Sequence, residues 1–181
     1  MESILDDIRN SVYDTFERVH LLTRHDMHNI KEEFKINANG VMHVNDKISV
    51  NKWVENCSNS EDSPILLYKD QNTINEALYP GMKKEDFLLV IMNSSQKEMM
   101  RSYGNDVICL DFTHGINSYG FDLETVLVLD DKREGFPAVF IISNRQDSVP
   151  LTIAFEAVKE HVAIKPEVLM SDDTESFYNA W

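Results

Sequence analysis

The sequence predicts an α/β protein, in which a mainly helical N-terminal region precedes a sheet of short strands. Two observations lead to this class. Before Pro64 the apolar residues recur at helical spacing, and after it they form short continuous runs bounded by polar residues, as buried strands do. Since 43% of the 181 residues are hydrophobic, the chain has enough apolar side chains to build a core.

The first stretch, from Ile4 to Phe34, has a helical stripe of apolar residues that is interrupted at Leu21 and Leu22. Thr23 followed by Asp26 resembles a capping box that opens a second helix. Two helices with such a break are compatible with a helix-turn-helix DNA reader. The second helix carries as many acidic as basic residues, so its face is not basic and a helical scaffold is favoured.

The middle of the chain mixes both kinds of pattern, and a boundary between two regions, 1–104 and 105–181, is predicted at its end. Gly104 is expected to end the last helix before that boundary. The expected elements are a helix at Ser49–Cys57, a polar loop at Asn56–Pro64, strands at Ile65–Tyr68 and Phe87–Met92, and a helix at Ser94–Tyr103.

The region 105–181 has the clearest strand signals. Its apolar runs lack polar alternation, which predicts strands covered on both faces. The expected order is a three-strand antiparallel meander, a crossover helix, and a fourth strand parallel to the first. That order is the opening of the ribonuclease H fold, although other α/β folds share it. The expected elements are strands at Val107–Leu110, Thr125–Leu129 and Ala138–Ile142, a turn at Asp130–Gly135, a helix from Asp147, a strand at Pro166–Met170 and a last helix.

Composition narrows the classes of function. The two cysteines, Cys57 and Cys109, form no CxxC pair, so no zinc site is expected. The acidic start lacks the apolar stretch of a signal peptide, and no apolar run could span a bilayer, so the protein is expected to be soluble, intracellular and without membrane contacts. The net charge of −14 disfavours strong binding of duplex DNA by this chain alone.

Two aspartates are the candidate catalytic residues. Asp111 and Asp172 each follow a buried strand, so if those strands are parallel neighbours, both carboxylates lie at one edge of the sheet. Facing carboxylates suit a pair of Mg²⁺ ions, which take oxygen ligands. Structural alternatives stay open: Asp172 with Glu175 fits a capping box, and Asp111 could form an Asx turn.

Three ordered segments of the chain carry motifs. Asp111–Tyr119 fits Asp-x-Thr-[Tyr/His]-x-x-Asn-x-Tyr, Gly135–Arg145 fits a Gly-x-Pro strand that ends in Ser-Asn-Arg, and Ser171–Asp173 with Ala180 fits a Ser/Thr-Asp…Asn-Ala segment. Together they resemble the Mutator-like (MULE) transposase family, which has a ribonuclease-H-like core. The likeness covers about 75 residues and extends loosely back to Phe87.

The resemblance implies metal-dependent DNA strand cleavage and transfer by an Asp-Asp-Glu triad with Mg²⁺ or Mn²⁺. Asp111 is then the first acid and metal ligand and Asp172 the second, with Asp173 as the alternative. No acid here is assigned as the third, so we expect a truncated, inactive chain with weak or no metal binding. His114 and Asn117 are substrate-side candidates. For Asn117 and Tyr119 a polar turn that links two strands, with Tyr119 packed on the sheet, is the favoured interpretation.

Other functions remain open beside this interpretation. The acidity and the missing third acid favour a domesticated, non-catalytic protein-interaction or regulatory module. A receiver-like α/β domain would require a parallel sheet order instead of a meander. The resemblance also implies DNA as the partner of the full-length family and a nuclear location. The sequence leaves the oligomeric state open, including a homo-oligomer.

Overall fold

The structure, a computed structural model, describes residues 23, 25, 26, 29, 42–115, 117–145, 147–171 and 180. They fall into two compact units, Met1–Val50 and Asn51–Trp181. In the first unit, Asp26 accepts hydrogen bonds from the backbone N–H (2.8 Å) and hydroxyl (2.6 Å) of Thr23, and the Asp26 N–H donates to that hydroxyl (3.2 Å). The capping box predicted for this pair is confirmed. The rest of the predicted helical stripe, Ile4 to Val19, lies outside the described residues.

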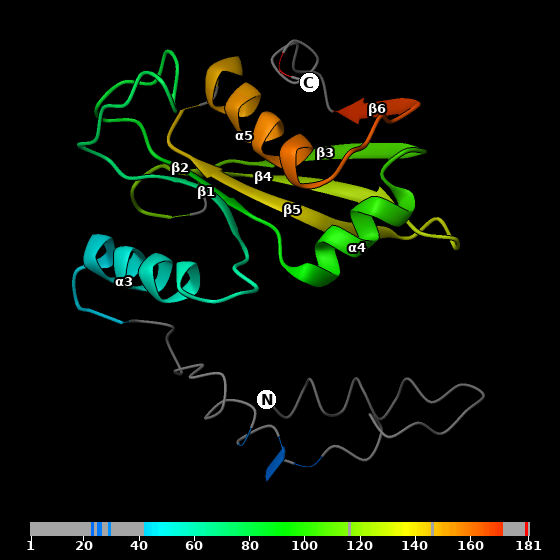
Figure 1. Ribbon diagram of the computed structural model, residues 1–181, viewed down its shortest axis with the longest axis horizontal. Helices are drawn as coiled ribbons and strands as arrows, with labels where there is room; N and C mark the ends of the chain where they lie inside the picture. Colours follow the sequence, from blue (N-terminus) through cyan, green and yellow to red (C-terminus); the bar gives the residue numbers. More distant parts are fainter. Residues whose placement is uncertain are drawn as a thin grey trace. The chain divides into compact units, whose positions relative to one another are not determined.

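The second unit is built on one six-stranded mixed sheet in the order β1-β2-β5-β4-β3-β6 (Figure 1). The described part of the chain is therefore α/β, as predicted. The helices are α3 (Asp46–Ser58), α4 (Ser94–Tyr103) and α5 (Ser148–His161). The strands are β1 (Ile65–Lys69), β2 (Leu88–Ile91), β3 (Val107–Thr113), β4 (Asp122–Leu129), β5 (Gly135–Ser143) and β6 (Val168–Ser171).

The strand pairings match the order expected after residue 104. β3, β4 and β5 form an antiparallel meander, α5 follows, and β6 pairs with β3 in parallel. A receiver-like sheet of parallel strands is excluded by these pairings. The boundary predicted after residue 104 falls inside this unit, because β1 and β2 pair into the same sheet through β5.

Helix α4 begins and ends where the sequence predicts. Asn93 and Gln96 form a reciprocal capping box at its start. Gly104 ends it with φ −68°, so no left-handed conformation is involved. The reason for glycine is space: a Cβ on Gly104 would lie 2.4 Å from the carbonyl oxygen of Met100 and 2.8 Å from its sulfur.

The sheet is covered unevenly, and the prediction that its strands are covered on both faces is wrong for β4. Along β4 the residues alternate between buried and half-buried, and its buried face includes Val126 and Val128. Helices α4 and α5 contribute Met100 and Phe155 to the core cluster on that face, and Figure 1 shows both helices over the sheet from the same side. The half-buried face carries Leu127 and Leu129, and for that reason the run Thr125–Leu129 shows no polar alternation.

Candidate functional site

Asp111 lies inside β3 and not at its end. The strand continues to Thr113 because β4 keeps pairing with it, with Asp111 opposite Thr125 and Thr113 opposite Leu123. This pairing corrects two expectations for Asp111: that it follows the end of the strand, and the alternative that it forms an Asx turn. Leu110 points into the core, and Asp111 is exposed on the opposite face, since neighbouring residues of a strand face opposite ways.

The strand that leads to Asp172 is the parallel neighbour of β3, as predicted. Leu110 of β3 pairs with Ser171, the last residue of β6. Asp111 follows Leu110 in the chain, and Asp172 follows Ser171. Asp172 and its alternative Asp173 lie outside the described residues, so the distance between the carboxylates stays a prediction.

The described residues offer a limited set of donors for a metal ion. Among residues 42–115, 117–145 and 147–171, no three His, Cys, Asp or Glu side chains are grouped to hold a metal. The exposed Asp111 carboxylate has the oxygen chemistry that Mg²⁺ and Mn²⁺ require, so it fits as one ligand. The fit of a complete site depends on acids beyond this part of the chain.

His114 and Asn117 lie in the connection between β3 and β4, residues 114–121. The imidazole Nδ1 of His114 lies 3.5 Å from Asp122 Oδ1 and its ring packs on Phe112 at 4.4 Å between centroids. Asn117 shapes the turn, since its side-chain oxygen accepts hydrogen bonds from the N–H groups of Tyr119 (2.9 Å) and Phe121 (3.2 Å). This geometry favours the turn interpretation of Asn117.

Tyr119 does not pack on the sheet as the turn interpretation supposed. Its side chain is 64% exposed. Its ring lies 6.3 Å from that of Phe121, and Phe121 in turn stacks on Phe87 at 4.9 Å. The contact with the body of the unit is therefore made by Phe121, two residues further along.

Two buried acids of β4, Asp122 and Glu124, escaped the sequence analysis. Both are 2% exposed and lie on the core face of the strand. Asp122 Oδ1 accepts a hydrogen bond from the Gly115 N–H at 2.9 Å, which ties the connection 114–121 to β4. The predicted strand begins at Thr125, whereas β4 begins at Asp122, so the sequence placed neither acid in a strand or on a buried face.

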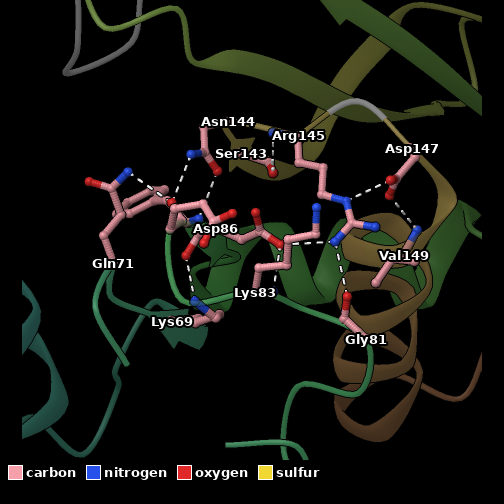
Figure 2. Close-up of polar contacts among 12 residues, drawn as sticks. Lys69, Gln71, Gly81, Lys83, Asp86, Ser143, Asn144, Arg145, Asp147 and Val149 are labelled. Atoms are coloured by element: carbon pink, nitrogen blue, oxygen red, sulfur yellow. Dashed lines mark hydrogen bonds and ion pairs between the residues drawn. The ribbon is translucent and has the colours of Figure 1, made fainter. Parts of the chain in front are cut away.

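The Ser-Asn-Arg end of the motif Gly135–Arg145 holds the long connection between β1 and β2 (Figure 2). Asn144 accepts a hydrogen bond from the Phe87 N–H (2.7 Å) and donates to the Glu85 carbonyl (3.0 Å). Arg145 donates to the Gly81 carbonyl at 3.0 Å. The motif therefore has a structural role here: it fixes a connection that lies far away in sequence.

Arg145 is also the centre of an ion-pair network. Its guanidinium donates to Asp86 (2.9 Å) and to Asp147 (2.6 Å), and Asp147 caps α5 through the Val149 N–H at 3.0 Å. The buried Lys69 ammonium donates to the Asp86 carbonyl at 2.5 Å. Figure 2 shows these side chains converging from β1, from the β1–β2 connection and from the residues after β5.

The network shifts the titration of its members. Burial alone would raise the pKa of Asp86, but the Lys83 N–H and the Arg145 guanidinium outweigh burial, so the pKa lies below its ordinary value. Burial lowers the pKa of Lys69, and nearby acids oppose that shift only in part. Burial likewise acts to lower the pKa of Arg145, but its two carboxylate partners raise it overall. Asp86 and Arg145 are therefore a charged pair at neutral pH.

Comparison with known proteins adds no assignment: no family model, curated protein or solved structure matches this chain significantly. No helix among the described residues is long and apolar enough to cross a membrane.

Proposed function

We propose that this chain carries the first two carboxylates of a metal-dependent enzyme that cuts and joins DNA strands, of the Mutator-like transposase type, with a ribonuclease-H-like sheet. One observation carries the proposal: β3 and β6 are parallel neighbours, and Leu110 pairs with Ser171. Each of these two residues is followed directly by a motif aspartate, Asp111 or Asp172. The meander and the crossover by α5 also support it, because the ribonuclease H fold opens in this order.

In this proposal Asp111 and Asp172 hold the divalent ions, with Asp173 as the alternative second ligand. Two ions held by carboxylates stabilise the attacking and the leaving oxygen of an in-line phosphoryl displacement. The chain's own contribution is position: β4 pairs with β3 at Asp111, and β6 pairs with β3 up to Leu110, the residue before it. DNA as the partner and a nuclear location belong to the same proposal.

Binding of Mn²⁺ alone tests the pair of carboxylates. Bound Mn²⁺ broadens the NMR signals of nearby amides, so we expect selective broadening at Leu110–Phe112 and at Val168–Ser171. Asp111→Ala and Asp172→Ala should each abolish it. Asp131→Ala, which removes an exposed acid in the turn after β4, is the matched control and should leave the broadening unchanged.

Two results would refute the assignment. One is broadening that survives both substitutions, and the other is broadening that is confined to surface acids such as Asp131. If Asp111→Ala abolishes the broadening and Asp172→Ala does not, Asp173→Ala is the next variant. Loss of broadening in Asp173→Ala would identify Asp173 as the second ligand, and unchanged broadening would show a site without a second motif acid.

A non-catalytic interaction or regulatory module is the second candidate function, and the net charge of −14 favours it. A polyanion is repelled by DNA and suits a basic protein partner better. This candidate predicts no Mn²⁺ broadening that Asp111→Ala and Asp172→Ala abolish, so the same Mn²⁺ experiment separates the two functions.

A further inference from the structure

Glu124 is a carboxyl group in an apolar setting. It is 2% exposed, and its Oε2 accepts no hydrogen bond from any residue that the structure describes. Its cross-strand neighbours are Phe112 of β3 and Ile141 of β5, which offer no side-chain donor. An ionised carboxylate without donors costs far more to bury than a neutral acid does.

The other buried acid of β4, Asp122, is in the opposite situation. It accepts from the Gly115 N–H at 2.9 Å and has the imidazole of His114 at 3.5 Å. Residues two apart on a strand lie on the same face about 7 Å apart, so a charge on Asp122 repels one on Glu124. Glu124 Oε2 has no donor among the described residues, so the neutral form of Glu124 is favoured over its charged form.

We propose that Glu124 is held as a neutral carboxylic acid in the folded protein, and that its ionisation is coupled to opening of the connection 114–121. The contacts explain why the connection would open. Asp122 links the connection to β4, and the repulsion between the two charged acids is relieved when Asp122 or Glu124 moves toward water. The connection carries His114 and Asn117, so the device would make this part of the molecule sensitive to pH.

The titration of Glu124 agrees with this geometry. Burial is the main cause that raises the pKa of Glu124 from 4.5 to about 8, and the charge of Asp122 adds to this rise. The backbone N–H of Glu124 opposes the shift. The charge of Asp122, on the same face of β4, acts on Glu124, and the imidazole of His114 lies 3.5 Å from Asp122. The groups opposite Glu124 on β3 and β5 are Phe112 and Ile141, which do not titrate.

The sign of the effect on stability follows from the raised pKa. Below pH about 4.5 the acid is neutral in both the folded and the unfolded chain, so it costs nothing. Between pH 4.5 and 8 the unfolded chain releases the proton and the folded chain keeps it, so stability falls as the pH rises. Above pH about 8 the loss is complete.

Unfolding by urea at pH 5.5 and pH 8 tests the proposal on the whole chain with Glu124→Gln, which keeps the shape and removes the titration. The unfolding constant of the wild type should rise about a hundredfold more than that of the variant between these pH values. Hydrogen exchange of the Gly115 amide should accelerate with pH more in the wild type than in the variant. Glu134→Gln, at an exposed site in the turn between β4 and β5, should behave as the wild type does.

Equal pH dependence of wild type and Glu124→Gln would overturn the proposal. A pH effect on global unfolding without one on Gly115 exchange would overturn the coupling to the connection. If Glu124→Gln does not fold, ¹³C NMR titration of the glutamate carboxyls in the wild type decides the matter. One glutamate titrating near pH 8 supports the proposal, and titration of all of them below pH about 6 refutes it.

Discussion

The guanidinium of Arg145 lies 2.9 Å from the carboxylate of Asp86, and the two residues are 59 positions apart in the chain. The Arg145 side chain is 22% exposed and that of Asp86 is 7% exposed, so the pair is largely shielded from water. It joins the end of β5 to the end of the β1–β2 connection.

Arg145→Ala should destabilise the protein by about 2–4 kcal/mol, because it leaves the buried Asp86 charge without its main partner. The measurement is the urea midpoint at neutral pH. Arg101→Ala is the matched control, since Arg101 pairs with Glu98 at 3.5 Å on the exposed face of α4. It should change stability by less than about 0.5 kcal/mol. Equal effects of both substitutions would show that the pair is energetically unimportant.

Asp86 should make the protein sensitive to acid. Its pKa is lowered in the folded state, so its contribution to stability is present above its unfolded value of 3.8 and is lost as the pH falls through the folded pKa. The stability difference between the wild type and Asp86→Asn should therefore be largest near neutral pH and shrink below pH about 4. A difference that is constant from pH 7 to pH 3 would contradict this reading of the ion pair.

Two glycines should respond to alanine for different physical reasons. Gly104→Ala should cost about 1–3 kcal/mol through the clash with Met100, although its φ of −68° suits alanine. Gly120→Ala meets nothing within 4 Å but places alanine at φ +70°, which costs about 1–2 kcal/mol. Truncating Met100 to alanine should reduce the penalty at Gly104 and leave that at Gly120 unchanged; thermal unfolding of the double variants measures both.

Duplex DNA should bind this chain only weakly. The net charge of −14 opposes neutralisation of phosphates, so we expect a Kd weaker than about 1 μM at near-physiological salt with Mg²⁺ present. A mobility-shift titration measures it. Submicromolar binding would show that a local basic reader outweighs the overall charge.

The chain by itself should not cut DNA. Only Asp111 and Asp172, with Asp173 as alternative, are assigned as metal ligands, and Mg²⁺ with few protein ligands is too poorly positioned for in-line attack. A nicking assay in Mg²⁺ or Mn²⁺ should show no activity for the wild type. Nicking that both Asp111→Ala and Asp172→Ala abolish would prove the prediction of inactivity wrong, while nicking that survives both would indicate a contaminating nuclease.

Local patterns in the sequence were enough to predict most elements of the sheet and the helix α4. Asn93, Gln96 and Gly104 delimit α4 through contacts within a few residues, so its bounds could be read directly. The antiparallel hairpin of β4 and β5 was predictable because its turn sequence, Asp130–Gly135, separates two apolar runs. The antiparallel order of β3, β4 and β5 followed from the short connections between them, but the pairing of β2 with β5 was not predicted.

The ends of β3 and the burial of single residues needed the tertiary structure. Whether Asp111 ends its strand depends on how far β4 pairs with β3, and the apolar run alone does not contain that length. The same holds for Arg145, whose partners Gly81 and Asp86 lie in a connection 59 or more residues away.

By itself, the sequence determined that Asp111 and Asp172 each follow an apolar run, since a hydrophobic run is a local property. Only the tertiary structure decided that Glu124 is buried and Asp111 exposed. The physical reason is that a strand apolar on both faces is symmetric in its pattern, and the covering of one face by α4 and α5 breaks that symmetry.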